Sequence, residues 1–193
     1  MVGKGRTMLK LNVHCRLFSA PPQALQRWIE ATWSGTPQDA FPRDVIKSWR
    51  KNPPGVDPLA LVPGKTKLGH GGFTFHFREW NGERWRVEFN GPWFSGWHGF
   101  ELRELNGGAH LMHTISLQAT GLGILLWRLL IEPIHDWAVE AMFDRLETAV
   151  ATGSIPEHTA RPMGRHARCA FWLFSRIFMK RSRQRHRRRE AIA

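Results

Sequence analysis

Apolar and polar residues alternate along the chain from residue 9 to 18, which predicts a β-strand. The Ser-Ala-Pro-Pro segment that follows predicts a helix over 23–33, because proline is tolerated in the first helical turn. Residues 34–64 are rich in proline and predict only a helical fragment near 44–49 and a strand-like stretch near 59–62.

From residue 72 to 118 the period is again two, with turn residues at Asn81-Gly82 and Asn106-Gly107. This pattern predicts the hairpins of an antiparallel sheet. In the first hairpin, setting the apolar face of 73–77 together with the apolar face of 85–89 favours a three-residue loop over 81–83.

The second hairpin has a more definite register. A two-residue loop on Asn106-Gly107 predicts these cross-strand pairs: Leu105 with Gly108, Leu102 with Leu111, Phe100 with His113, and His98 with Ile115. We expect the apolar residues of both strands to share one face, and His98 and His113 to be the strongly polar residues among them.

Beyond Gly121 and Gly123 the hydrophobic period becomes that of a helix, with an apolar stripe over 127–150. Acidic residues line the other side: Glu132, Asp136, Glu140 and Asp144. Pro133 marks either a kink or the first turn, and Gly153 ends the helix.

The basic residues are concentrated at the carboxy-terminal end. Residues 161–193 contain eleven Lys and Arg and one acid, Glu190, in a chain whose formal net charge is +12. We therefore expect a nearly neutral domain over 9–153, a linker over 154–164, and a basic tail over 165–193 that suits an anionic partner.

Apolar residues of the tail fill one arc of a helix that is too short to span a bilayer, which takes about twenty residues. Such a helix can lie in a membrane interface beside a cluster of cations. The tail residues expected to bind a membrane are Phe171, Trp172, Phe174, Phe178, Lys180, Arg181 and Arg183. The alternatives are a nucleic acid or another polyanion, or a helix that docks on its own domain.

Composition narrows the class of protein. Two cysteines, Cys15 and Cys169, supply neither a disulfide framework nor a cysteine-based zinc cluster. The first thirty residues carry charges and a proline pair where a signal peptide needs an unbroken apolar stretch, so we expect a cytoplasmic protein, peripheral at the inner face of the membrane. Ten Trp and twelve Phe indicate either a solid aromatic core or the wall of an apolar cavity.

Three segments together resemble the START/polyketide-cyclase (SRPBCC) superfamily. Residues 11–28 (LNVHCRLFSAPPQALQRW) are similar to its first strand and helix start, 98–113 (HGFELRELNGGAHLMH) to its strand, Gly-Gly turn and strand, and 131–146 (IEPIHDWAVEAMFDRL) to its closing helix. The resemblance implies an α+β helix-grip fold. In that fold a curved antiparallel sheet of about six or seven strands wraps around a long C-terminal helix, with a ligand cavity between them. The superfamily shares no catalytic residue set, so the resemblance assigns no catalytic role.

His98 and His113 are the candidates for a catalytic base, because imidazole gives or takes a proton near pH 7. The alternatives are a half-buried histidine bonded to backbone or water, or a hydrogen bond to the polar end of a ligand. The residues expected to line the cavity are Phe75, Phe77, Trp85, Phe89, His98, Phe100, His113, Ile134 and Trp137.

Other pairs carry less chemistry. His135 and Asp136 point about 100° apart on a helix and are not expected to pair, and His14 and Cys15 face opposite ways on a strand. Gly69-His70-Gly71-Gly72 lacks the Lys-Ser/Thr of a phosphate loop and predicts a bend. Metal, serine-hydrolase and dinucleotide motifs are not found, and we expect no metal and no cofactor.

The function expected is binding or transport of a hydrophobic, lipid-like or polyketide-like molecule at an anionic membrane surface. The alternative is a cyclase or dehydratase acting on an aromatic or polyketide-like substrate. A second alternative is a nucleic-acid-binding scaffold that uses the basic tail. Neither the ligand nor the oligomeric state follows from the sequence.

Overall fold

The computed structural model describes residues 7–34, 67–70, 73–156 and 161–176. The fragments expected near 44–49 and 59–62 lie outside these residues. So do the tail residues Phe178, Lys180, Arg181 and Arg183.

One six-stranded antiparallel sheet forms the centre of the described chain, in the order β1-β6-β5-β4-β3-β2. Its strands are β1 (Thr7–Phe18), β2 (Lys67–His70), β3 (Phe73–Trp80), β4 (Arg84–Asn90), β5 (Phe94–Leu105) and β6 (Gly108–Thr120). Helix α1 (Pro22–Ser34) follows β1 as predicted.

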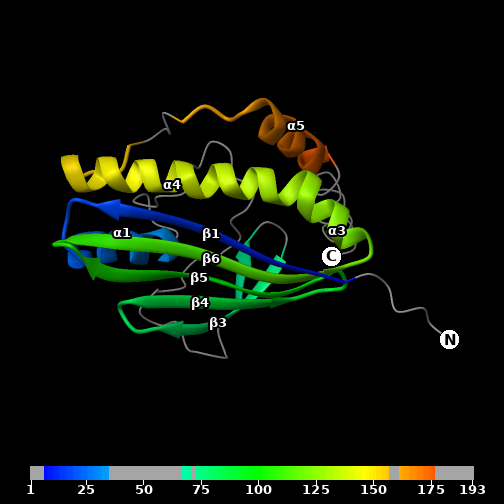
Figure 1. Cartoon of the computed structure of the whole chain (residues 1–193), viewed down its shortest axis with the longest axis horizontal. Helices are drawn as coiled ribbons and strands as arrows, with labels where there is room; N and C mark the ends of the chain where they lie inside the picture. The colour runs from blue at the N-terminus through cyan, green and yellow to red at the C-terminus, as the bar shows by residue number, and fades with distance from the viewer. Residues whose placement is uncertain (1–6, 35–66, 71–72, 157–160, 177–193) are drawn as a thin grey trace, which may run out of the picture.

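After the sheet, α3 (Leu122–Leu126), the π-helical turn η2 (Trp127–Ile131) and α4 (Glu132–Thr152) follow one another, and α5 (Arg165–Phe174) comes after a non-helical connection. Figure 1 shows α4 along one face of the sheet, with α5 on the other side of α4. The predicted α+β helix-grip fold is thus confirmed, with six strands in the described part of the chain.

The core lies between the sheet and α4. The predicted apolar stripe of α4 is buried, and burial extends beyond it to Val139 and Phe143, which are no more than 1% exposed. Because β1, α1 and α5 all contact α4, its buried surface is wider than one stripe. Pro133 lies in the first turn of α4, and Gly153 ends the helix in the left-handed conformation with φ 76°.

The β5–β6 register is confirmed at every predicted pair. Asn106 and Gly107 have φ values of 53° and 77°, as a two-residue hairpin turn of type I′ requires. In the β3–β4 hairpin, Phe75 pairs with Phe89 and Phe77 with Val87, as the matched apolar faces demand. The three-residue loop is wrong in detail, because a bulge after Phe77 shifts the register so that Trp80 pairs with Trp85.

Strand β1 has an unusual distribution of side chains. Its outward positions are apolar and exposed, with Leu9 at 80% and Leu11 at 63%. Its inward positions, which face α4, include Lys10, Asn12, His14 and Arg16. The side of β1 that meets the helix is therefore polar.

Candidate functional site

The residues expected to line a cavity lie together on the concave side of the sheet and on α4. All nine are at most 8% exposed: Phe75, Phe77, Trp85, Phe89, His98, Phe100, His113, Ile134 and Trp137. The seven on β3 to β6 are joined by ring contacts, with centroids between 4.7 and 6.4 Å apart. The hairpin registers place these side chains on one face, as the alternation of apolar residues predicts.

His98 and His113 lie inside this aromatic group, diagonally related on adjacent strands as predicted. Their ring centroids are 5.7 Å apart. Phe75 approaches His98 at 5.0 Å, and Phe100 approaches His113 at 4.7 Å. Two polar rings thus lie in a mostly apolar interior.

The row of imidazoles continues beyond the predicted pair. The ring of His135, on α4, lies 5.0 Å from that of His113 and 5.9 Å from that of His14, on β1. His14 pairs directly with His113 between β1 and β6, whereas Cys15 is exposed on the opposite face, as predicted. Four imidazoles therefore connect the aromatic interior with the seam between β1 and α4.

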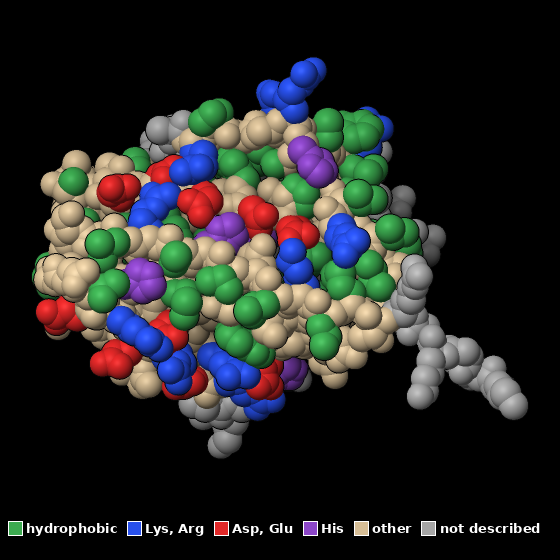
Figure 2. Space-filling model, viewed as in Figure 1, with side chains coloured by type: hydrophobic (Ala, Val, Ile, Leu, Met, Phe, Trp, Pro, Cys, Tyr) green, Lys and Arg blue, Asp and Glu red, His purple; other side chains and the backbone are tan. Residues whose placement is uncertain are grey.

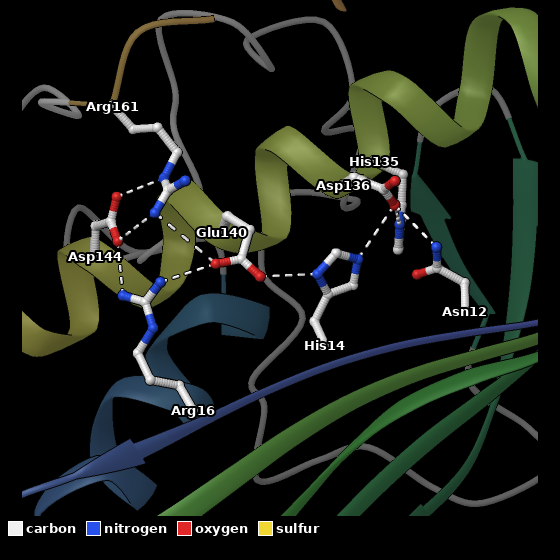
Figure 3. A network of polar contacts seen from close by, with 8 residues as sticks. All are labelled: Asn12, His14, Arg16, His135, Asp136, Glu140, Asp144 and Arg161. Carbon is white, nitrogen blue, oxygen red and sulfur yellow. Dashed lines mark hydrogen bonds and ion pairs between the residues drawn. The ribbon is translucent and has the colours of Figure 1, made fainter. Parts of the chain in front are cut away.

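Asp136 is the centre of the polar contacts at this seam (Figure 3). Its Oδ1 accepts a hydrogen bond from Asn12 Nδ2 at 2.9 Å and lies 3.2 Å from His14 Nε2 and 3.5 Å from His135 Nδ1. The expectation that His135 and Asp136 cannot meet is wrong. Adjacent positions on a helix diverge by about 100°, but the rings of His135 and His14 both reach Oδ1 of Asp136.

Glu140 and Asp144 extend the network along α4. His14 Nδ1 lies 2.9 Å from Glu140 Oε1, and Arg16 donates to Glu140 and to Asp144 at 2.8 and 2.6 Å. Arg161 donates to both oxygens of Asp144, at 2.6 and 3.0 Å. The stretch just before α5 is thereby tied to α4.

The charges of the seam change its proton affinities. Burial lowers the pKa of His14, but hydrogen bonds and charges from Asp136 and Glu140 outweigh burial and raise that pKa above its ordinary value. Burial lowers the pKa of His135, against the opposing effect of Asp136. Burial raises the pKa of Asp136, but hydrogen bonds from His135, His14 and Asn12 prevail and hold that pKa well below its usual range.

A signal for this seam was present in the sequence. Polar residues recur at every second position from Lys10 to Arg16, and acids recur at every fourth position from Glu132 to Asp144. Each set alone is typical of a solvated face, and more than 120 residues separate the partners. The resemblance could have linked them, because the closing helix of a helix-grip fold lies against the sheet.

The described tail residues have two different environments. Phe174 is 4% exposed and belongs to the core together with Ala167 and Ala170, so this face of α5 packs on the domain. Phe171 is partly buried against the same core. Trp172, by contrast, is 55% exposed, and the guanidinium of Arg176 lies 4.2 Å from the centre of its ring.

A row of exposed leucines lies on α3 and η2. Leu122, Leu125 and Leu129 are 54–56% exposed, and α5, which carries the exposed Trp172, packs against η2. Figure 2 shows hydrophobic side chains gathered at the end of the molecule where α3 and α5 meet. We call Leu122, Leu125, Leu129, Trp172 and Leu173 the apolar end. No helix in the described part of the chain is long and apolar enough to cross a membrane.

Comparison with known proteins identifies the fold and little else. No protein-family model matches the chain, and no curated protein matches it in sequence. Among solved structures, Ara h 8.0201 is similar with a TM-score of 0.52 and 12% identity, over 75% of this chain and 99% of that one. A truncated norcoclaurine synthase from Thalictrum flavum is similar with a TM-score of 0.50 and 11% identity, over 78% and 99%. At these identities the likeness to both structures concerns the fold, which agrees with the fold that the resemblance in the sequence implies.

Proposed function

We propose that the protein binds a hydrophobic small molecule between the concave face of the sheet and α4. The observation that carries the proposal is the pair His98 and His113, buried among aromatic rings. Ligand sites are mostly apolar, with a few polar groups that orient the ligand, and this interior has that composition. The similarity in fold to Ara h 8.0201 supports an interior that lies between a sheet and a long helix.

Two measurements test the ligand. Organic extraction of purified protein followed by mass spectrometry should release a bound apolar molecule, and delipidated protein should bind a fatty acid or an apolar dye. Val87→Phe adds a ring to the buried face beside His98, while Glu88→Phe adds the same ring at the next, half-buried position of β4. We expect Val87→Phe alone to weaken binding by about tenfold or more, since the ligand and the added ring together would overpack the interior, at a cost of about 1–3 kcal/mol. Equal binding by both variants, or no ligand by either route, would contradict the proposal.

We also propose that the apolar end meets an anionic membrane surface. Exposed leucines and a tryptophan are suited to the boundary between headgroups and acyl chains. Arg128 is exposed on η2, Arg176 is exposed just after α5, and the basic segment from Lys180 to Arg189 follows in sequence. Cations near an anionic leaflet contribute about 1 kcal/mol each.

Sedimentation with vesicles tests this second part. We expect the protein to sediment with vesicles containing phosphatidylserine and much less with phosphatidylcholine alone. Leu125→Glu with Leu129→Glu should weaken vesicle binding by about a hundredfold or more, since each buried leucine contributes about 1.5–3 kcal/mol. Val13→Glu with Leu17→Glu is the matched control, because these residues are similarly exposed on the outer face of β1. Equal loss from both pairs, or preferential capture of RNA, would refute the membrane role.

An enzyme is the alternative, and the 5.7 Å separation of His98 and His113 favours it. A cyclase or dehydratase would use one imidazole as a general base. His98→Ala or His113→Ala should then lower the turnover rate by a factor of about 10² to 10⁴, while the affinity for the ligand stays within about tenfold of the parent. Equal loss of binding and turnover would indicate that the histidines only shape the interior.

A further inference from the structure

We propose that His14, His135 and Asp136 form a binding site for a divalent transition-metal ion at the seam between β1 and α4. The donor atoms of these three residues all lie within 4.8 Å of one another. They come from two elements that are far apart in sequence, and the fold alone brings them together.

Two of the three donor separations suit a metal ion of the size of zinc. His14 Nε2 is 3.2 Å and His135 Nδ1 is 3.5 Å from Asp136 Oδ1. In a tetrahedral zinc site with bonds of about 2.0–2.1 Å, neighbouring donor atoms are about 3.3 Å apart. Both pairs are therefore near the required spacing before any metal is added.

The surrounding residues hold two of the ligands in orientation. His14 Nδ1 lies 2.9 Å from Glu140 Oε1, and Asn12 donates to Asp136 at 2.9 Å. A histidine that binds a metal usually donates its other ring N–H to a carboxylate or carbonyl, which fixes the tautomer. With that proton on Nδ1, the lone pair of His14 lies on Nε2, the atom that approaches Asp136. Glu140 is fixed in turn by Arg16.

The ligand set also indicates the kind of ion. Two imidazoles and one carboxylate suit zinc, iron(II), nickel or copper, whereas magnesium and calcium prefer oxygen ligands only. Three protein ligands leave a further position open for water or an anion. Trp127 has a ring 6.1 Å from that of His135, and its buried Nε1 has no hydrogen-bond acceptor among the described residues.

The site is reachable from solvent, because the side chain of Asp136 is 41% exposed. The competing explanation is that a proton alone bridges His14 and Asp136. That explanation predicts an ion pair with no particular affinity for metal. The two explanations therefore differ in whether metal binds and in which residues it needs.

Calorimetric titration of the full-length, untagged, chelator-treated protein with ZnCl2 distinguishes them. We expect one zinc per chain, and we expect Asp136→Asn and His14→Gln each to weaken binding by at least about tenfold. His110→Gln and His166→Gln are the matched controls, since both remove a histidine elsewhere on the described chain. Cobalt(II) should give an absorption band of a low-symmetry site in the parent and in both controls, and not in the two ligand variants.

Thermal unfolding supplies the check on folding. Zinc should raise the Tm of the parent and of the controls but leave the Tm of Asp136→Asn unchanged. His135→Gln replaces any ligand variant that does not fold. The metal site is overturned if the parent binds zinc no more tightly than Asp136→Asn and His14→Gln do, or if the two control substitutions weaken binding as much as the ligand substitutions.

Discussion

Phe174 and Trp172 are two residues apart on α5, yet the structure assigns them opposite roles. Phe174 is 4% exposed in the core, and Trp172 is 55% exposed. Substituting a buried phenylalanine by alanine costs about 3–5 kcal/mol, and we expect the lower end because α5 is a peripheral helix that can settle into the space. For a domain of this size, about 3 kcal/mol corresponds to a fall in Tm of about 6–12 °C.

Trp172→Ala is the matched variant. It removes a stacking contact with Arg176, which at an exposed site contributes about 0.5–1 kcal/mol. Urea unfolding in the absence of lipid measures both variants, and vesicle sedimentation should show the reverse order, with Trp172→Ala the weaker binder. If Phe174→Ala unfolds at the same urea concentration as the parent, α5 does not pack on the domain in solution, and Phe174 becomes free to face a membrane.

Three further predictions follow from other parts of the structure. A Cβ at Gly99 would lie 2.1 Å from the carbonyl oxygen of Trp85, whereas one at Gly164 would meet nothing within 4 Å. Gly99→Ala should therefore lower the free energy of unfolding severely, and Gly164→Ala should lower it by less than about 1 kcal/mol. Urea unfolding of both variants measures the difference. Hydrogen bonds from Arg161, partly opposed by burial and assisted by Arg16, lower the pKa of Asp144, so its contribution to stability is fully present above about pH 5 and is lost as the pH falls through the folded pKa. The difference in unfolding free energy between the parent and Asp144→Asn should accordingly shrink as the pH falls below about 5, and a constant difference would refute the ion pair as its source. Cys15 and Cys169 are both exposed, so two thiols per chain should react with a colorimetric thiol reagent under native conditions. Reaction of only one thiol per chain would show that the surface around the other cysteine is covered in solution.

The sequence predicted best what neighbouring residues determine. Asn106-Gly107 set the β5–β6 register, because two consecutive residues with positive φ define the turn and the turn fixes every pair beyond it. The bulge after Phe77 was not predictable, since no glycine or turn residue marks it and the matched apolar faces fit either register near the loop.

The candidate site divides in the same way. His98 and His113 were found because alternation places them on the apolar face. His14 and His135 were not, because their roles depend on contacts between β1 and α4 that local sequence does not encode. Docking of the tail helix on its own domain was one of three alternatives that the sequence left open, because the burial of Phe174 depends on the surfaces of α4 and η2, which its own helical arc cannot reveal.

The contacts between β1 and α4 also set the position of the helix along the strand. From Lys10 to Arg16 the strand advances six residues, roughly 20 Å, while from Glu132 to Asp144 the helix advances twelve residues, roughly 18 Å. Two residues of the strand and four residues of the helix thus cover nearly the same length. The long Lys and Arg side chains make up the small difference. If α4 slid by one turn in one direction, Lys10 would face Arg128. If it slid in the other direction, Arg16 would face Thr148. The helix therefore has one favoured position along the strand, and every group that α4 carries, including His135, is held at a fixed place along β1.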